Sequence, residues 1–326
     1  FGLAPGRIAP EYPLPGSPER CVRRWAVADE TGGLWMLERI APGQVPRREA
    51  LGRLLAELSA TGQPPENPAL AALIPAYRGV AGGGFVLREE VECAPGDNSS
   101  GPLAGDWQLS PYVPGLALPR PEYLDEAWRG EALAEVILLL RRAGEHLAEL
   151  PSAPTADLVR YRNELFATIG NSQSHSRLLP RLGPFRAALE QLPALLAAQP
   201  PVLAHGDLHP LNAIWGKASL RAVIDWEFSG ARPLLYDAAC CIGCAGFEHP
   251  SALGRGFVLG LIRGLRRGGI DAEHLRLLPG MVLASRLGWL SEWLRKGDAE
   301  MLDMELDYLD ILLNTAPALQ RLWTQP

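Results

Sequence analysis

The stretch of sequence that decides the fold is His205-Gly206-Asp207-Leu208-His209-Pro210-Leu211-Asn212, and Ile224-Asp225-Trp226-Glu227 follows it. Asp207 and Asn212 lie five residues apart on one loop, and Asp225 lies thirteen residues beyond Asn212. Between them, short apolar runs flank the turn sequence Gly216-Lys217-Ala218-Ser219. This pattern predicts a strand hairpin that returns Asp225 to the side of the Asp207 loop.

These residue types fit phosphoryl transfer, a reaction that asks a protein for positioning and charge neutralisation more than for covalent chemistry. An Asp has to meet the attacking hydroxyl, and oxygen ligands have to hold Mg²⁺ against the nucleotide phosphates. The offset of Asp207 and Asn212 is that of the Asp and Asn in the protein-kinase catalytic loop, and Asp225 takes the place of the metal-bridging Asp. The alternative is that all three are ordinary turn residues, because such short patterns also arise by chance.

Length and composition narrow the class of protein. The chain has 326 residues, enough for two domains or for one enzyme built from two lobes. Hydrophobic residues make up 47% and charged residues 21%, and no run of 18 apolar residues occurs, which argues against a membrane-spanning helix and a disordered chain. The net charge of −6 argues against a nucleic-acid partner, which usually requires a basic surface. We therefore expect no nucleic-acid and no membrane partner.

The five cysteines indicate a reducing compartment. Their number is odd and no secretory apolar segment opens the sequence, so we expect a cytoplasmic protein. Cys241-Ile-Gly-Cys244 has the spacing of half a zinc or redox site, but the sequence supplies no second pair of ligands. The motif lies in an apolar run from Ala238 to Phe247, where cysteine is expected to act as a small buried hydrophobic residue.

Short strand-like runs separated by Gly and Pro turns occupy the first part of the sequence, and long amphipathic segments occupy the rest. This pattern predicts an α+β protein with a β-rich N-terminal lobe over residues 1–113 and a mostly helical C-terminal lobe over residues 114–326. In the first lobe the expected strands are Cys21–Val27, Leu34–Ile40, Phe85–Val91 and Trp107–Val113, and one helix carries the stripe Leu51, Leu54, Leu55 and Leu58. In the second lobe the expected helices are Asp125–Leu150, Leu158–Ile169, Phe185–Ala198, Leu234–Phe247, Ala252–Arg267, Leu275–Leu294 and Met301–Leu313. Three short apolar runs of strand length interrupt them at Val202–Ala204, Ala213–Trp215 and Arg221–Ile224.

The chain resembles the aminoglycoside phosphotransferase and choline-kinase-like family of small-molecule kinases, which share the bilobal protein-kinase fold. The resemblance rests on His205 through Asn212, on Ile224 through Glu227 and on Tyr236-Asp237. The segment Trp107 through Gly115 is similar to the family's hinge between the lobes, so the resemblance extends over most of the chain.

The resemblance implies an ATP-dependent kinase that moves the γ-phosphoryl group to a hydroxyl of a small molecule such as a sugar, an amino alcohol or an aminoglycoside. Asp207 would be the catalytic base, and Asn212 and Asp225 would hold Mg²⁺. His205 and Asp237 would brace the catalytic loop. Backbone groups near Ser110 and Tyr112 would meet the adenine. A non-catalytic nucleotide-binding protein (a pseudokinase) and, less favoured, a protein kinase are the alternatives.

The N-terminal lobe departs from the family pattern. The family usually has a Lys on the strand matching Leu34–Ile40 to hold the nucleotide phosphates, but residues 1–113 contain no Lys and strict alignment places Glu38 there. Arg39 next to it is the expected replacement. The expected acid on the following helix is Glu49, and Glu57 is the alternative. The alternative cations are Arg23 and Arg24.

Arg47 and Arg48 lie at the start of the same helix, where cations oppose the helix dipole. We read them as a solvated face, the alternative being that an anion lies near them. The turn Gly16 through Arg20 is a candidate phosphate-covering loop.

Two features of the C-terminal region bear on the acceptor. Acidic residues recur from Asp298 to Asp310, and we read them as the solvated face of a helix, the alternative being a surface that attracts a cationic substrate. Trp289 and Trp293 lie at i and i+4 and are expected in the core, although an aromatic wall could also stack on a sugar. His209 in the loop could reach a substrate hydroxyl or pack within the turn.

Overall fold

The computed structural model describes residues 1–3, 6–14, 21–59, 68–88 and 105–325. Contacts divide the chain into two compact units. Unit 1 comprises residues 1–117 and 211–227, and unit 2 comprises residues 118–210 and 228–326. The second segment of unit 1 falls within the range expected for the C-terminal lobe, so Asn212 and Asp225 pack with the N-terminal residues while Asp207 belongs to unit 2.

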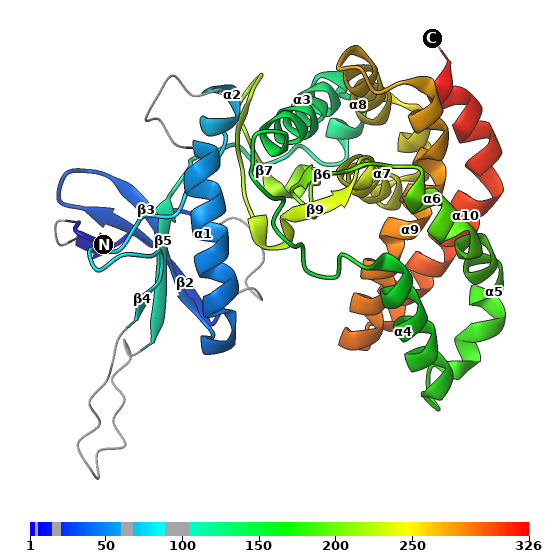
Figure 1. Cartoon of the computed structure of the whole chain (residues 1–326), viewed down its shortest axis with the longest axis horizontal. Helices are drawn as coiled ribbons and strands as arrows, with labels where there is room; N and C mark the ends of the chain where they lie inside the picture. The colour runs from blue at the N-terminus through cyan, green and yellow to red at the C-terminus, as the bar shows by residue number, and fades with distance from the viewer. Residues whose placement is uncertain (4–5, 15–20, 60–67, 89–104, 326) are drawn as a thin grey trace. The chain divides into compact units, whose positions relative to one another are not determined.

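Unit 1 is built on an antiparallel sheet with strand order β1-β2-β3-β5-β4 (Figure 1). Its strands are β1 (Gly6–Ile8), β2 (Arg23–Asp29), β3 (Leu34–Ile40), β4 (Leu87–Arg88) and β5 (Asp106–Pro111). The expected hairpin between the first two long strands forms as β2 and β3, because Asp29 closes the turn by accepting hydrogen bonds from the N–H groups of Thr31 and Gly33. The expected strand Phe85–Val91 is shorter in its described part, and residues 89–91 lie outside the described residues.

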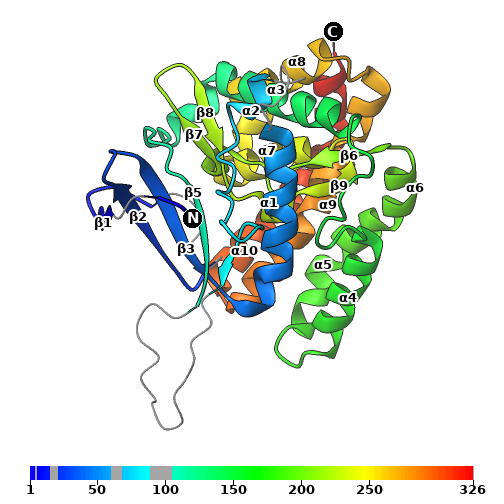
Figure 2. The same ribbon diagram turned by 60° about the vertical axis from the view of Figure 1, so that its left-hand side comes forward.

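Helix α1 (Val45–Ser59) lies along one face of this sheet, as Figures 1 and 2 both show. Leu51, Leu54 and Leu55 of the predicted stripe are buried, and Val45 joins Ile40 and Val86 in a small core. The short helix α2 (Pro68–Ala71) follows. Packing of the leucine stripe therefore fixes which side chains of α1 face the sheet.

A hairpin of strands β7 (Ala213–Trp215) and β8 (Leu220–Val223) completes unit 1. The predicted turn closes through a hydrogen bond from the Gly216 N–H to the Ser219 carbonyl. The Val223 N–H donates to the Leu73 carbonyl, and a β-bridge joins Leu116 to Trp215. These backbone contacts explain why this segment clusters with unit 1.

Unit 2 is mostly helical and contains one small sheet, in which β6 (Pro201–Ala204) pairs with β9 (Gly230–Pro233). Strand β9 is absent from the sequence prediction, because a Gly and a Pro bound it. The helices are α3 (Ala127–Gly144), α4 (Leu158–Asn171), α5 (Leu179–Ala188), α6 (Leu192–Ala197), α7 (Tyr236–Glu248), α8 (Gly256–Arg267), α9 (Ala272–Lys296) and α10 (Ala299–Thr324). The 3₁₀ turns Glu122–Asp125 and Pro250–Gly254 lie at the starts of two expected helices, and the 3₁₀ turn Leu189–Gln191 divides the expected helix Phe185–Ala198 into α5 and α6.

Helices α3 and α8 pack closely through glycine. A Cβ on Gly130 would lie 1.9 Å from the carbonyl oxygen of Phe257, so only glycine permits this approach. Helices α9 and α10 run side by side (Figure 2), and α10 continues through Pro317 beyond the predicted end at Leu313. Among the described residues, no helix combines the length and the apolar character that crossing a bilayer requires.

Candidate functional site

Asp237, the second residue of α7, holds the loop that carries Asp207 through two hydrogen bonds. One carboxylate oxygen of Asp237 accepts the N–H of His205 at 2.7 Å, and the other accepts the N–H of Gly206 at 2.8 Å. Burial raises the pKa of Asp237 to about 6, although both N–H donors and Arg232 lower it. The side chain thus satisfies two backbone donors that would otherwise be buried without partners.

Gly206 makes the loop geometrically possible. Its φ is +83°, and a Cβ at this position would lie 2.1 Å from the carbonyl oxygen of Phe228. The Nδ1 atom of His205 accepts the N–H of Asp207 at 3.3 Å, and Ser229 donates its hydroxyl to the His205 carbonyl. His205, Asp207 and Asp237 are therefore brought together in unit 2, in the arrangement expected of a braced loop.

Aromatic side chains lie next to this loop within unit 2. The Nε2 atom of His209 is 3.8 Å from a carboxylate oxygen of Asp207, and the ring of His209 lies 6.3 Å from that of Trp289. Trp289 in turn stacks on Trp293 at 5.4 Å, and both rings are half-buried. The predicted core tryptophans thus keep part of their surface exposed near the loop.

Asp225 adopts an unusual backbone conformation in unit 1. Its φ is +63°, a left-handed value that is uncommon for any residue but glycine, though Asp tolerates it. The neighbouring Trp226 anchors the turn by donating its indole N–H to the Val223 carbonyl at 2.7 Å. Such strain is found where surrounding contacts hold a residue in a functional orientation.

Asp225 lines a cavity that lies wholly within unit 1, and four residues of the predicted hinge, Ser110 through Val113, line it too. Its polar lining comes from β2, β3, α1, the segment after β5 and the turn after β8, and includes Arg24, Glu38, Arg48, Ser110, Tyr112, Asp225 and Glu227. The backbone N–H of Tyr112 donates to the Leu34 carbonyl, so an adenine would have to meet another group of this segment. Asn212 is buried below the hairpin, where its carbonyl accepts the Ile224 N–H.

Arg39 and Glu49 do not meet in unit 1, and neither lines this cavity. Successive side chains of a strand point to opposite faces, so with Glu38 on the cavity side Arg39 faces away, where its guanidinium lies against Gly105. Glu49 accepts the backbone N–H groups of Phe85 and Val86 and lies 3.8 Å from Arg53. Of the alternative cations, Arg24 reaches the cavity.

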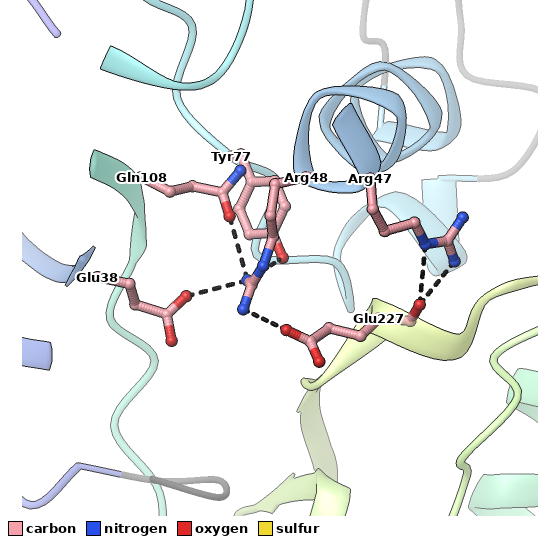
Figure 3. A network of polar contacts seen from close by, with 6 residues as sticks. All are labelled: Glu38, Arg47, Arg48, Tyr77, Gln108 and Glu227. Carbon is pink, nitrogen blue, oxygen red and sulfur yellow. Dashed lines mark hydrogen bonds and ion pairs between the residues drawn. The ribbon is translucent and has the colours of Figure 1, made fainter. Parts of the chain in front are cut away.

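The residue that the sequence analysis missed is Arg48. It is 4% exposed, contrary to the expected solvated face, and it lies at the centre of a network of polar contacts (Figure 3). Its guanidinium donates to Glu38, to the Tyr77 hydroxyl, to Gln108 Oε1 and to the carboxylate of Glu227. No local pattern could have revealed this role, because Glu227 lies 179 residues further along the chain.

The described cysteines are free thiols, and Cys241 is buried. Burial raises the pKa of Cys241 well above its ordinary value, so the thiol stays protonated and acts as the predicted buried hydrophobic residue. Cys21, Cys240 and Cys244 are likewise free thiols. No three His, Cys, Asp or Glu side chains gather into a metal site over the described ranges. The predicted phosphate-covering turn, Gly16 through Arg20, lies outside those ranges.

The family profile and the similar solved structures are all those of phosphotransferases or kinases. The sequence profile of the "Phosphotransferase enzyme family" matches residues 21–278. No curated protein matches the sequence. Amicoumacin kinase hAmiN, solved with AMP-PNP, Ca²⁺ and Ami, is similar with a TM-score of 0.60 at 14% identity, covering 93% of this chain and 90% of that chain.

Two further solved structures are similar. A thermostable mutant of aminoglycoside phosphotransferase APH(4)-Ia, in a ternary complex with AMP-PNP and hygromycin B, has a TM-score of 0.61 at 15% identity and covers 96% and 95% of the two chains. The apoenzyme of macrolide 2'-phosphotransferase MphH from Brachybacterium faecium has a TM-score of 0.52 at 19% identity and covers 88% of each. At these identities the likeness establishes the fold, and the predicted α+β, protein-kinase-like class is confirmed.

Proposed function

The chain belongs to the phosphotransferase enzyme family, whose profile covers most of its length, and is thus a small-molecule kinase; from that premise we propose that it transfers the γ-phosphoryl group of ATP to a hydroxyl group of its acceptor. The observation that carries the proposal is the Asp207 loop, which Asp237 holds through two backbone hydrogen bonds. A loop held in this way presents a carboxylate with little freedom to reorient. Positioning of this kind is what phosphoryl transfer demands of a protein.

Asp207 is the proposed catalytic base. As the acceptor oxygen forms its bond to the γ-phosphorus, the bond from that phosphorus to the bridging oxygen breaks and ADP leaves. The carboxylate of Asp207 takes the proton that the hydroxyl gives up. His205 and Asp237 hold the loop, and His209 lies close enough to Asp207 to orient the acceptor hydroxyl.

Asn212 and Asp225 are the proposed ligands of Mg²⁺. An amide oxygen and a carboxylate suit this ion, which usually takes only one or two protein ligands and completes its shell with phosphates and water. Bound Mg²⁺ would neutralise charge on the phosphates, while Ser110 and the segment around Tyr112 would receive the adenine.

The acceptor is proposed to be a polyhydroxylated small molecule, such as a sugar, an amino alcohol or an aminoglycoside. The stacked pair Trp289 and Trp293 offers a flat apolar face near His209 on which a sugar ring could pack. The similar solved structures that hold hygromycin B or amicoumacin make amine-bearing antibiotics sensible first acceptors. The free cysteines fit a reducing compartment such as the cytoplasm.

One observation favours a second candidate, a nucleotide-binding protein without catalysis. Glu38 occupies the strand position at which the family usually has a Lys, and a carboxylate there would repel phosphates. The two candidates differ in turnover, so they are separated by assay.

The test measures ADP release from ATP and Mg²⁺ across a panel of sugars, amino alcohols, aminoglycosides and macrolides. With an acceptor identified, Asp207→Asn should lower kcat by about 10²–10⁴-fold, the usual range for loss of a general base, with nucleotide affinity nearly unchanged. Asp271→Asn, at an exposed helix N-cap, is the matched control. Normal turnover by Asp207→Asn would exclude its role as base, and loss of ATP binding would assign it to the metal site instead.

A further inference from the structure

We propose that Arg48 is a positioning residue that holds the Asp225 turn through its contact with Glu227. Arg48 also pairs with Glu38 on strand β3, so the acid lies on the strand and the cation on the helix, the reverse of the expected strand Lys and helix acid. The inference rests on the proposed function, because it assigns Asp225 to the metal. In this chain the acid is on strand β3 and the cation is on helix α1: Glu38 lies 3.3 Å from Arg48. Both residues line the cavity. The strand carries an acid where a Lys was expected, and the helix carries the cation.

Arg48 is anchored on the sheet side by three acceptors. Glu38 on β3, Gln108 on β5 and the Tyr77 hydroxyl all accept from the same guanidinium nitrogen, at 3.3, 3.1 and 3.2 Å (Figure 3). Burial lowers the pKa of Arg48, but Tyr77 and the two carboxylates raise it further, so the guanidinium remains charged. Acceptors outside the Asp225 turn therefore help to fix the orientation of the Arg48 guanidinium.

The opposite nitrogen of Arg48 reaches Glu227, which α1 holds twice. The Glu227 carboxylate accepts from Arg48, and the Glu227 carbonyl accepts from Arg47 at 3.0 and 2.7 Å. Figure 3 shows the two arginines meeting the two ends of this one residue from the start of α1. Both the backbone and the side chain of Glu227 are therefore tied to the helix.

Glu227 lies two residues beyond Asp225, whose φ of +63° is unfavourable for a residue with a Cβ. A conformation of this kind persists where its surroundings hold it. The contacts from Arg47 and Arg48 close the turn on one side, and the bond from Trp226 to Val223 closes it on the other. It follows that Arg48 acts on the metal site through the turn, with most of its donors engaged by protein.

Lysine cannot replace arginine in this role. The planar guanidinium of Arg48 meets four acceptors in fixed directions, whereas an ammonium group has three donors on one atom and cannot span Glu38 and Glu227 together. Residues that orient metal ligands typically cost about 10–100-fold in metal affinity when removed. A reversed pair of this type thus ties helix position to metal binding.

The test titrates Mg²⁺ against the purified full chain with ADP, following nucleotide binding by calorimetry with and without the metal. Arg48→Lys and Glu227→Gln should each weaken the Mg²⁺-dependent part of binding by about 10–100-fold. Metal-free ADP binding should fall by a smaller factor than the Mg²⁺-dependent part, because Ser110 and Tyr112 still line the cavity although Arg48 and Glu227 line it too. Arg53→Gln, an exposed arginine on the same helix, should match wild type in both measurements.

The double exchange Glu38→Arg with Arg48→Glu separates a positioning role from a simple ion pair. It restores an attractive strand–helix pair but sets a carboxylate against Glu227, so we expect no recovery of Mg²⁺-dependent binding. Recovery by the double exchange, or wild-type Mg²⁺ dependence in Glu227→Gln, overturns the inference while leaving the proposed function intact. If wild type binds ADP without any response to Mg²⁺, the proposed metal site itself fails and this inference fails with it.

Discussion

Replacing Glu305 by glutamine should destabilise the protein more than any other single change to a charged side chain in α10. Glu305 and Arg286 are 0% and 1% exposed, and the Arg286 Nε donates to Glu305 at 2.8 Å, with a second parallel bond between the groups. Phe247 and Tyr308 rings surround the guanidinium at 4.9 and 5.3 Å. Glu305 is also the exception to the predicted solvated face of this acidic helix.

The expected size of the effect follows from what the variant leaves behind. Glu305→Gln keeps the shape and one acceptor but strands a buried cation, and breaking one side of a buried pair costs about 3–5 kcal/mol. The surrounding rings remain and offset part of this through cation–π attraction, worth about 1–2 kcal/mol where water is excluded. The free energy of unfolding should therefore fall by about 1–4 kcal/mol.

Urea unfolding followed by circular dichroism measures this loss. Arg286→Met combined with Glu305→Leu removes both charges and should remain within about 1–2 kcal/mol of wild type, because an apolar replacement of a buried pair is often neutral. Arg295→Gln, which removes a surface pair with Glu292, is the control and should cost less than about 1 kcal/mol. If Glu305→Gln unfolds at the same urea concentration as wild type, the buried cation does not depend on this carboxylate and the reasoning is refuted.

Two further predictions concern the Asp207 loop. Asp237 has a pKa of about 6 in the folded protein against an ordinary 3.8, so the unfolded chain releases this proton first, and stability present below pH 3.8 is lost as the pH rises through 6. Urea titrations should show wild type losing about 3 kcal/mol relative to Asp237→Asn between pH 4 and pH 7, and a constant difference between the two proteins would contradict this. Gly206→Ala should place a Cβ against the Phe228 carbonyl and lower kcat at least as much as Asp207→Asn does, whereas Gly183→Ala, with open space around it, should leave turnover unchanged; equal activity in the two alanine variants would show that the loop tolerates the change.

Local pattern accounts for the elements that formed as predicted. Leu34–Ile40 and Ala213–Trp215 have the bounds expected from their apolar runs, because short runs with turns on both sides leave few alternatives. Helix α10 runs on to Thr324 because Pro317 is tolerated within a helix whose buried face, including Trp323, continues past it. Tertiary packing decided where this helix ends.

Some residues of the candidate site could be expected from the sequence, and others only from the structure. Asp207 could be singled out by the motif and spacing of its own loop, whereas Asp237 was expected only from the resemblance to the small-molecule kinases. Strand alternation was sufficient to place Glu38 and Arg39 on opposite faces, but only the structure shows which face holds the cavity. Arg48 could not be found, since its partners come from β3, β5 and a turn at the far side of the sequence.

The division of unit 1 into two separated segments has a consequence for synthesis of the chain. Residues 1–117 leave the ribosome first, but the hairpin that pairs with Leu116 and Leu73 follows the whole stretch 118–210. At typical translation rates the first segment of unit 1 waits on the order of ten seconds for the β7–β8 hairpin. During that interval Arg47 has no Glu227 to contact, whereas Arg48 already has its acceptors on Glu38, Tyr77 and Gln108, so the Asp225 turn takes its final form late in folding.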